Sequence, residues 1–383
     1  MRTEETRCFP VIGSTVGIGV VGLGGMGQLH ARNLRELGAD IVAGADLVPE
    51  QRERFAEEFG ARTYEDHEGL VADEDVDAVV VTTPNRFHEP ITVAALEAGH
   101  DVLVEKPLAH TVESAERIAA VEARAEGFCM VGFHNRHAAS TVMFDEHRDR
   151  FGELTHVEAN YVRRRGVPGP GSWFTNPDLA GGGALIDIGV HALDLALYLL
   201  DFPEIEEVSG VTRSTFGESA EYADPDGFGA GWDADPEPYE VDDSVTAFVR
   251  CAGGKTVTLE AAWATNREPT SEFAVRGTDA GARFDVGDTD LSILEASTAG
   301  CDHYVDSTLT GDPTIDGHAG QDRAFLEAVV TGESPETNTI EQALAVQRVI
   351  DAIYRSSEEG RAQRLETQAE ATARPAEQEL SQN

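Results

Sequence analysis

Lysine is almost absent from this chain of 383 residues, which has only Lys106 and Lys255. With arginine they make 29 basic residues against 70 acidic ones, so the formal net charge is −41. A surface this acidic repels nucleic-acid phosphates and anionic lipid headgroups, and we expect neither nucleic acid nor a membrane as a partner. Because 41% of the residues are hydrophobic, the acid excess indicates a solvated coat on a folded protein, a halophilic composition suited to a high-salt cytosol.

Cysteine is scarce and long apolar runs are missing. The four cysteines (8, 129, 251 and 301) form no CxxC pair, which argues against a disulfide framework and a zinc cluster. The most apolar helical stretch, 192–200, is too short to span a bilayer and contains Asp194. The N-terminus lacks the basic segment of a secretory signal. These features predict a cytoplasmic protein.

Two domains are expected from the length and from a change near residue 150 in the order of the predicted strands and helices. In 16–150, β-branched runs alternate with amphipathic stretches, the pattern of a doubly wound parallel sheet, or Rossmann fold. The predicted strands are 16–21, 41–45, 78–82, 101–104 and 128–132, and the predicted helices are 26–37, 49–59, 90–98 and 112–125.

The region 151–360 reads instead as an α+β domain with an open, mostly antiparallel sheet. Its predicted strands are 154–163, 208–213, 244–251, 256–264 and 272–276, and its predicted helices are 188–200, 321–330 and 340–356, of which the last two pack back on the body. Residues 1–15 are expected to be an N-terminal extension, 216–240 an exposed acidic insertion, and 361–383 a disordered tail.

A glycine-rich turn follows the first predicted strand. The segment GLGGMG places Gly22, Gly24 and Gly27 in GxGxxG spacing, with Gly25 and Met26 between them, directly before a helix. Such a turn brings a dinucleotide pyrophosphate to a helix N-terminus. Asp46, at the end of the second strand, is placed to bind ribose hydroxyls. The alternative is a plain turn beside a surface carboxylate.

The acidic Asp46 favours NAD, because a carboxylate repels the 2′-phosphate of NADP. NADP stays open, since Arg52 or Arg54 can rearrange to accept that phosphate.

Polar residues cluster at the ends of two further strands. One end carries Thr83, Pro84, Asn85 and His88, and the other carries Glu105, Lys106 and Pro107. Ligands bind at the carboxyl ends of strands in such sheets. A lysine in a chain that otherwise uses arginine suggests a group that must exchange a proton. The alternative is a cation that balances Glu105.

The segment GGGALIDIGVHALD places Asp187, His191 and Asp194 near one face of a helix. Asp187 can orient His191 and stabilise its imidazolium, so that the other ring nitrogen takes a hydroxyl proton. The alternatives are three structural side chains or a metal pair. No further cluster with ligand spacing accompanies the pair, and we predict no metal.

The motifs GLGGMG, TPN at 83–85, EKP at 105–107 and DIGVHALD at 187–194 together resemble the Gfo/Idh/MocA family over residues 16–360. The resemblance implies a Rossmann domain joined to a substrate domain with an open antiparallel sheet. It implies that Lys106, Asp187 and His191 are catalytic, that Thr83, Asn85 and His88 lie near nicotinamide and substrate, and that Lys106 and Pro107 are joined by a cis peptide. It also implies a homodimer or homotetramer.

The expected activity is transfer of a hydride between NAD(P) and a secondary alcohol of a sugar or polyol. Lys106 or His191 removes the hydroxyl proton, Asn135 and Asp194 bind substrate hydroxyls, and Trp173 with arginines 163–165 lines the substrate pocket. Two alternatives are a sugar- and dinucleotide-sensing regulator without turnover, and an enzyme that cleaves glycosides through transient NAD-dependent oxidation.

Overall fold

The computed structural model describes residues 16–169, 171–217, 222–225, 227 and 239–365. The extension 1–15, parts of the acidic insertion 216–240 and residues 366–383 of the tail lie outside the described residues, so the predictions for them stay predictions. The predicted disorder is wrong for the start of the tail, because Gln363–Arg364 form a strand that pairs with Glu207 and Val208. Tyr239, in the insertion predicted to be exposed, is buried. The described chain divides into two compact units. The first comprises 16–109, 113–137 and 315–341, and the second comprises 110–112, 138–314 and 342–365.

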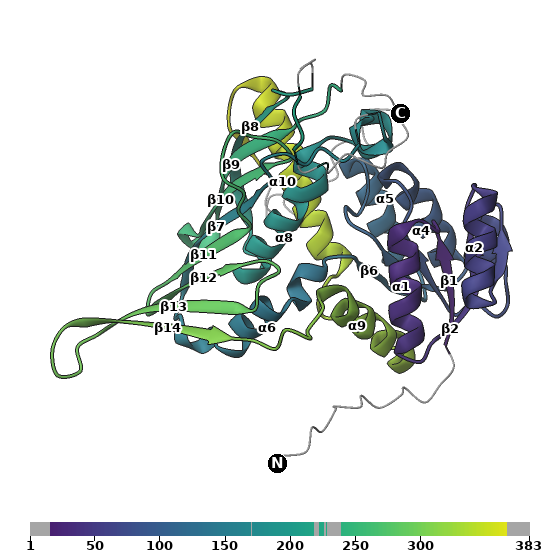
Figure 1. The fold of residues 1–383 in the computed structure, drawn as a ribbon, viewed down its shortest axis with the longest axis horizontal. Coiled ribbons are helices and arrows are strands. Elements are labelled where there is room, and N and C mark those ends of the chain that lie inside the picture. Colours follow the sequence, from purple (N-terminus) through teal and green to yellow (C-terminus); the bar gives the residue numbers. More distant parts are fainter. Residues whose placement is uncertain (1–15, 170, 218–221, 226, 228–238, 366–383) are drawn as a thin grey trace, which may run out of the picture. The chain divides into compact units, whose positions relative to one another are not determined.

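The first unit is built on a sheet of six parallel strands in the order β3-β2-β1-β4-β5-β6 (Figure 1). The strands are β1 Gly17–Val21, β2 Asp40–Ala45, β3 Arg62–Tyr64, β4 Ala78–Val81, β5 Asp101–Val104 and β6 Cys129–Val131. The helices are α1 Gly25–Glu36, α2 Pro49–Phe59, α3 His67–Val71, α4 His88–Glu97, α5 Val112–Glu122 and α9 Gly317–Thr331, with short turns η1 Asn85–Phe87 and η2 His134–His137. The predicted Rossmann fold is confirmed.

The core of this unit follows from strands that are apolar on both faces. All residues of β1 and β4 are buried, as a parallel sheet covered on both sides requires. Pro49 begins α2, where its fixed φ suits the first helical turn, and Gly60 ends it at φ 71°. Helix α9, expected in the second domain, belongs to the first unit because Phe325 and Leu326 pack into the same core as Ile18 and Leu34.

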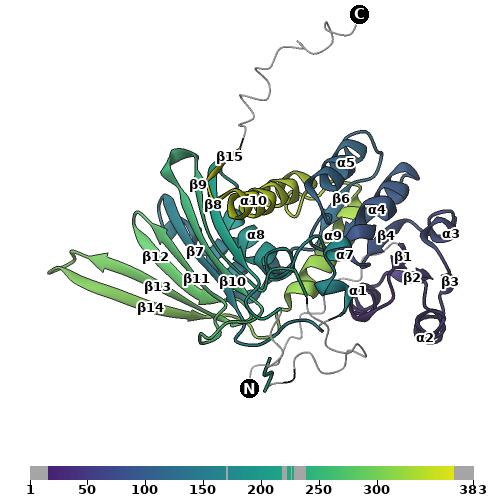
Figure 2. The same ribbon diagram turned by 90° about the horizontal axis from the view of Figure 1, so that it is seen from above.

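The second unit contains a nine-stranded sheet in the order β14-β13-β12-β11-β7-β10-β9-β8-β15 (Figure 2). Strands β7 and β10 pair in parallel and the other pairs are antiparallel, which confirms the predicted mostly antiparallel sheet. The strands are β7 Leu154–Val162, β8 Ile205–Arg213, β9 Ser244–Cys251, β10 Thr256–Ala262, β11 Glu272–Gly277, β12 Ala280–Asp285, β13 Asp290–Ser297, β14 His303–Thr310 and β15 Gln363–Arg364.

Helices cover one face of this sheet (Figure 2). They are α6 Ala139–Glu146, the π-helical turn η5 Leu185–Gly189, α8 Val190–Leu199 and α10 Ile340–Glu359. The unit also contains the short helix α7 Pro177–Ala180 and the short turns η3 Arg148–Arg150, η4 Trp173–Thr175 and η6 Ala252–Gly254. Burial alternates along the strands: in β9, Val249 is buried and its neighbour Phe248 is 38% exposed. This alternation leaves the opposite face of the sheet to solvent within the described part of the unit.

The segment Pro177–Leu199 is long and apolar enough to cross a membrane by composition alone. In this unit its apolar window is 83% buried, and Gly181 at φ 84° interrupts the helical run after α7. The segment therefore has the burial of a core helix.

Candidate functional site

The glycine turn between β1 and α1 has the geometry of a pyrophosphate site. Gly22 adopts φ 91°, and a Cβ at Gly27 would lie 2.0 Å from the carbonyl oxygen of Gly22, so neither position accepts a side chain. By contrast, a Cβ at Gly24 or Gly25 would meet no atom within 4 Å, which leaves room for a ligand. Helix α1 has no side-chain cap and no acidic residue in its first turn. Its N-terminal N–H groups can therefore bind an anion.

Asp46, at the end of β2, supports this turn directly. Its Oδ2 accepts the backbone N–H of Leu23 at 2.8 Å, and its Oδ1 accepts that of Val48 at 2.8 Å. Arg52 donates to the carbonyl oxygens of Asp46, at 2.7 Å, and Leu47, at 3.2 Å. The carboxylate thus ties the end of β2 to the glycine turn, beside the position where the ribose of a dinucleotide lies in this fold.

Thr82, which sequence reasoning did not single out, also holds the turn. Its hydroxyl donates to the carbonyl oxygen of Gly22 at 2.6 Å. Its position in the sequence could have indicated this role, because Thr82 directly follows β4, the strand next to β1. Together the turn, Asp46 and Thr82 form a cradle that fits an NAD pyrophosphate and ribose.

The loop after β4 carries the predicted residues Thr83, Pro84, Asn85 and His88. Asn85 is buried, and the His88 ring lies between two carbonyl oxygens: Nδ1 is 2.8 Å from that of Pro107 and Nε2 is 2.9 Å from that of Thr83. Burial lowers the pKa of His88, so the neutral ring donates to one of these carbonyls. The polar atoms of His88 are directed to backbone, which points to positioning of this loop rather than cofactor contact.

Lys106 follows β5, and the Lys106–Pro107 peptide is cis, as the resemblance implied. The Lys106 side chain belongs to a partly exposed residue, whereas Glu105 and Pro107 are buried. Glu105 Oε2 accepts the backbone N–H of Lys106 at 3.1 Å. Because β1, β4 and β5 are neighbours, the glycine turn, the 82–88 loop and Lys106 share one edge of the sheet.

Turn η2 contributes Asn135, which is buried, and His134. The His134 ring stacks on that of His318 from α9, with centroids 3.7 Å apart. Burial, helped by His318, lowers the pKa of His134 to about 3, so this imidazole is neutral. The role of Asn135 as a substrate ligand stays a prediction.

In the second unit, Asp187 lies in the π-helical turn η5 and His191 in the first turn of α8. The Nε1–H of Trp263 donates to Asp187 Oδ2 at 2.8 Å. The rings of His191 and Tyr161 lie 6.4 Å apart between centroids. A π turn alters the angular spacing of side chains and recurs at functional sites, so the relation of Asp187 to His191 is set by this turn rather than by a regular α-helix. Asp194 is 1% exposed, and its predicted substrate contact stays a prediction.

Asp242 holds the start of this helical segment and was missed by sequence reasoning. Its Oδ1 accepts the N–H of Gly183, its Oδ2 that of Leu185, each at 2.8 Å, and its carbonyl oxygen accepts the N–H of Ala184 at 2.7 Å. A Cβ at Gly183 would lie 1.9 Å from that carbonyl oxygen, which explains a glycine there. The Tyr354 hydroxyl donates to the same carboxylate at 2.8 Å. Burial raises the pKa of Asp242.

Trp173 lies in η4 and stacks on Phe174, with ring centroids 3.8 Å apart. Arg165 is tied to the 264–266 segment, where it donates to the Thr265 carbonyl at 2.9 Å and to the Asn266 side chain at 2.9 Å. Arg164 is exposed. Arg165 thus uses its guanidinium to hold the neighbouring loop. The role of Trp173 in the substrate pocket stays a prediction.

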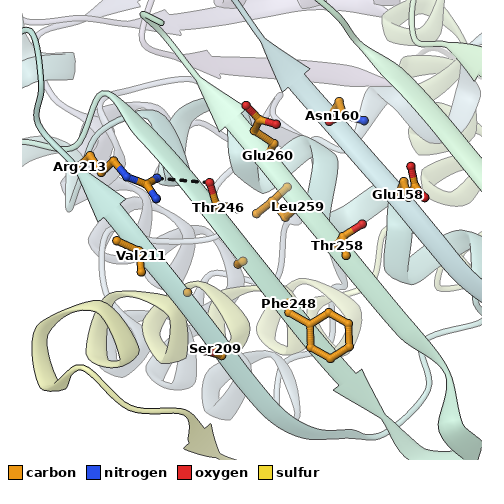
Figure 3. A pocket seen from close by; sticks show the side chains of 12 residues that line it. Glu158, Asn160, Ser209, Val211, Arg213, Thr246, Phe248, Thr258, Leu259 and Glu260 are labelled. Atoms are coloured by element: carbon orange, nitrogen blue, oxygen red, sulfur yellow. Dashed lines mark hydrogen bonds between the residues drawn. The ribbon is translucent and has the colours of Figure 1, made fainter. Parts of the chain in front are cut away.

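A hollow of about 430 Å³ lies on the uncovered face of the nine-stranded sheet, as Figure 3 shows. Its walls include Val211, Phe248, Thr258 and Glu260, from β8, β9 and β10. None of the predicted site residues lines it. The described residues also contain no group of three side chains suited to a metal ion.

Comparison with known proteins also indicates an NAD-binding oxidoreductase. Residues 16–133 match the family described as "Oxidoreductase family, NAD-binding Rossmann fold", and residues 147–283 match the GFO/IDH/MocA C-terminal domain. The chain is 31% identical to D-glucoside 3-dehydrogenase of Escherichia coli (strain K12), over 84% of this chain and 89% of that protein. It is 30% identical to D-xylose 1-dehydrogenase (NADP(+)) 2 of Haloferax volcanii, over 91% of this chain and 98% of that protein.

Among solved structures, GenD2 from gentamicin A biosynthesis in complex with NAD is 27% identical, with a TM-score of 0.74, and the match covers 92% of this chain and 97% of that one. The likeness therefore extends over both units. The chain belongs to the Gfo/Idh/MocA family of NAD(P)-dependent oxidoreductases.

Proposed function

We propose that the protein reversibly oxidises a secondary alcohol of a sugar or polyol, with NAD as hydride acceptor. The relatives act on a glucoside and on xylose, which supports this substrate class. The observation that carries the proposal is Lys106, one of only two lysines, at a buried strand end that shares its sheet edge with the glycine turn. The nicotinamide ring supplies the hydride chemistry when it is bound.

The protein residues would manage the proton. Lys106 or His191 removes the hydroxyl proton as the alcohol becomes a carbonyl, and Asp187, held by Trp263, orients His191. Asn135, Asp194 and Trp173 are proposed to contact the substrate. A regulator without turnover would need none of these acid–base groups.

A substrate panel at high salt tests the proposal. NAD and NADP reduction is measured with pentoses, hexoses, inositols, their acids and glycosides. Lys106→Ala should lower turnover by about 10²- to 10⁴-fold and leave NADH affinity within about threefold, because proton transfer and not cofactor binding is removed. Lys255→Ala is the matched control. Full activity of Lys106→Ala would exclude the assigned role, binding without turnover would indicate a regulator, and free sugar without net NADH would indicate glycoside cleavage.

NAD is proposed over NADP because a 2′-phosphate would meet the Asp46 carboxylate. Arg52, a nearby cation, is held by two backbone carbonyls and lies 3.4 Å from Glu65 Oε1. NADH and NADPH binding are compared by fluorescence titration. Tighter NADPH binding would contradict this preference and show that an arginine rearranges.

Self-association through the uncovered sheet face is proposed for the oligomer. Four arginine–glutamate pairs lie on or beside the strands of this sheet, and within each pair the charges compensate one another, unlike the acid excess of the whole chain; the pairs are Arg276–Glu158, Arg267–Glu260, Arg283–Glu272 and Arg250–Glu207. Two copies can therefore approach here with less repulsion than elsewhere. Val211 and Phe248 add apolar area.

Light scattering after size exclusion measures the mass of the wild type and of Phe248→Asp. The variant should shift toward the monomer, whereas Val330→Asp on α9 should not. An unchanged mass for Phe248→Asp would exclude this face.

A salt-rich cytoplasm is proposed as the setting, because screening relieves repulsion within a chain of net charge −41. Stability should rise with KCl in thermal melts. A melting temperature that falls with KCl would contradict it.

A further inference from the structure

A buried network of charged side chains lies behind Lys106 in the first unit. His30 of α1 places Nδ1 2.6 Å from Asp322 Oδ1 of α9 and Nε2 3.0 Å from Glu105 Oε1 at the end of β5. His30 and Asp322 have no exposed surface, and Glu105 is 8% exposed. Asn33 donates to the other Asp322 oxygen at 2.8 Å.

The geometry favours a charged imidazole. Each ring nitrogen faces a carboxyl oxygen, so when both carboxyl groups are ionised both contacts are hydrogen bonds only if both nitrogens carry protons. Burial opposes that charge, yet Asp322 and Glu105 together raise the pKa of His30 to about 10. Burial would likewise favour protonated Glu105, but His30 lowers the pKa of that carboxyl to about 2. A carboxylate–imidazolium–carboxylate chain results.

This series of hydrogen bonds ends at the backbone of Lys106. Glu105 Oε1 accepts the hydrogen bond from His30 Nε2–H, and Glu105 Oε2 accepts that from the Lys106 backbone N–H. On the far side of the same dipeptide, His88 lies 2.8 Å from the Pro107 carbonyl oxygen. A Cβ at Gly132, directly after β6, would come within 2.8 Å of Glu105 Oε1, so a glycine at this position leaves room for the carboxylate.

His30 also belongs to the helix that begins at the glycine turn, three residues after Gly27. The network therefore joins the helix that receives the pyrophosphate to the strand end that carries Lys106. A buried ion pair needed only for stability would be replaceable by apolar groups without loss of activity.

We propose that His30 and Asp322 are positioning residues that act through Glu105, keeping its carboxylate ionised and fixed so that Lys106 stays next to a negative charge and in place relative to α1. This inference rests on the proposed function for the role of Lys106. It adds His30 and Asp322 to the site, and neither of them needs to touch substrate.

The two lysines allow a test that does not depend on turnover. Reductive methylation by formaldehyde and cyanoborohydride, followed by peptide mass spectrometry, gives the labelling rate of Lys106 relative to Lys255, an internal reference in the same molecule. Glu105→Gln removes the negative charge that interacts with the Lys106 ammonium, and His30→Gln removes the cation that keeps Glu105 ionised. Both variants should raise this ratio by roughly threefold or more, because the amine loses its charged neighbour.

Asp73→Asn is the matched control, because Asp73 is a largely buried carboxylate that pairs with Arg62 in the same unit. It should leave the labelling ratio unchanged. With a substrate found in the panel, Glu105→Gln and His30→Gln should lower kcat by about 10- to 100-fold while KM for NAD changes less than about threefold, and Glu105→Asp should restore part of kcat.

Unchanged labelling in both Gln variants, or an equal change in Asp73→Asn, would overturn the inference. If the Gln variants change the Lys106 labelling ratio but the wild type oxidises no member of the substrate panel, the positioning role of the network stands and the proposed function is refuted instead.

Discussion

The buried imidazolium of His30 makes a specific prediction about stability against pH. The pKa of this group is raised from 6.5 to about 10 in the folded chain, so its protonated form is favoured by about 5 kcal/mol relative to the unfolded chain. Loss of one member of a buried ion network costs about 3–5 kcal/mol, which agrees in size. His30→Gln should therefore lower the unfolding free energy by a few kcal/mol.

The sign of the pH dependence follows from the raised pKa. The stabilisation is fully present below pH 6.5, the pKa of an unperturbed histidine, and is lost as pH rises through about 10. Urea unfolding in concentrated KCl, followed by fluorescence across this range, gives the difference between wild type and His30→Gln at each pH. That difference should shrink steadily as pH rises.

Asp73→Asn again provides the control, because the pKa of Asp73 is lowered and its contribution is lost only in acid. Its stability difference should stay flat over the same range. A His30→Gln difference that is equally flat would refute a charged His30 in the folded protein.

Three further predictions concern other contacts. Gly24→Ala should weaken NADH binding with unchanged stability, since no atom lies within 4 Å of the new Cβ, whereas Gly27→Ala should also lower the melting temperature; equal melting temperatures would contradict the close packing at Gly27. Trp263→Phe removes the hydrogen bond to Asp187 and should lower kcat by about tenfold with little change in the KM for NAD, and an unaltered kcat would show that this bond does not orient Asp187. Tyr354→Phe should cost about 1–3 kcal/mol in urea unfolding, because a buried carboxylate loses a donor, and no loss would mean that water replaces the hydroxyl.

Sequence patterns predicted those elements whose pattern of buried residues is visible within a short stretch of sequence. The β-branched runs at β1, β4 and β5 and the alternation in β9 were read correctly because one short window contains the whole signal. The three-residue edge strand β3 and the short helix α3 were missed, since each is too short to show a period. Strands β12, β13 and β14 were missed because their sequences mix apolar with charged and turn-forming residues, and pairing with neighbours supplies their order.

The sequence by itself determined the parts of the site that are contiguous: the glycine turn, Lys106 at a strand end, and the spacing of Asp187 and His191. Only the tertiary structure decided what holds them. His30 meets Asp322 across 292 positions of sequence, and Trp263 meets Asp187 across 76. Such pairs depend on which elements the fold packs together, and no local periodicity encodes that choice. The charge state of His30 is decided in the same way, because it comes from burial between two carboxylates that the chain itself keeps far apart.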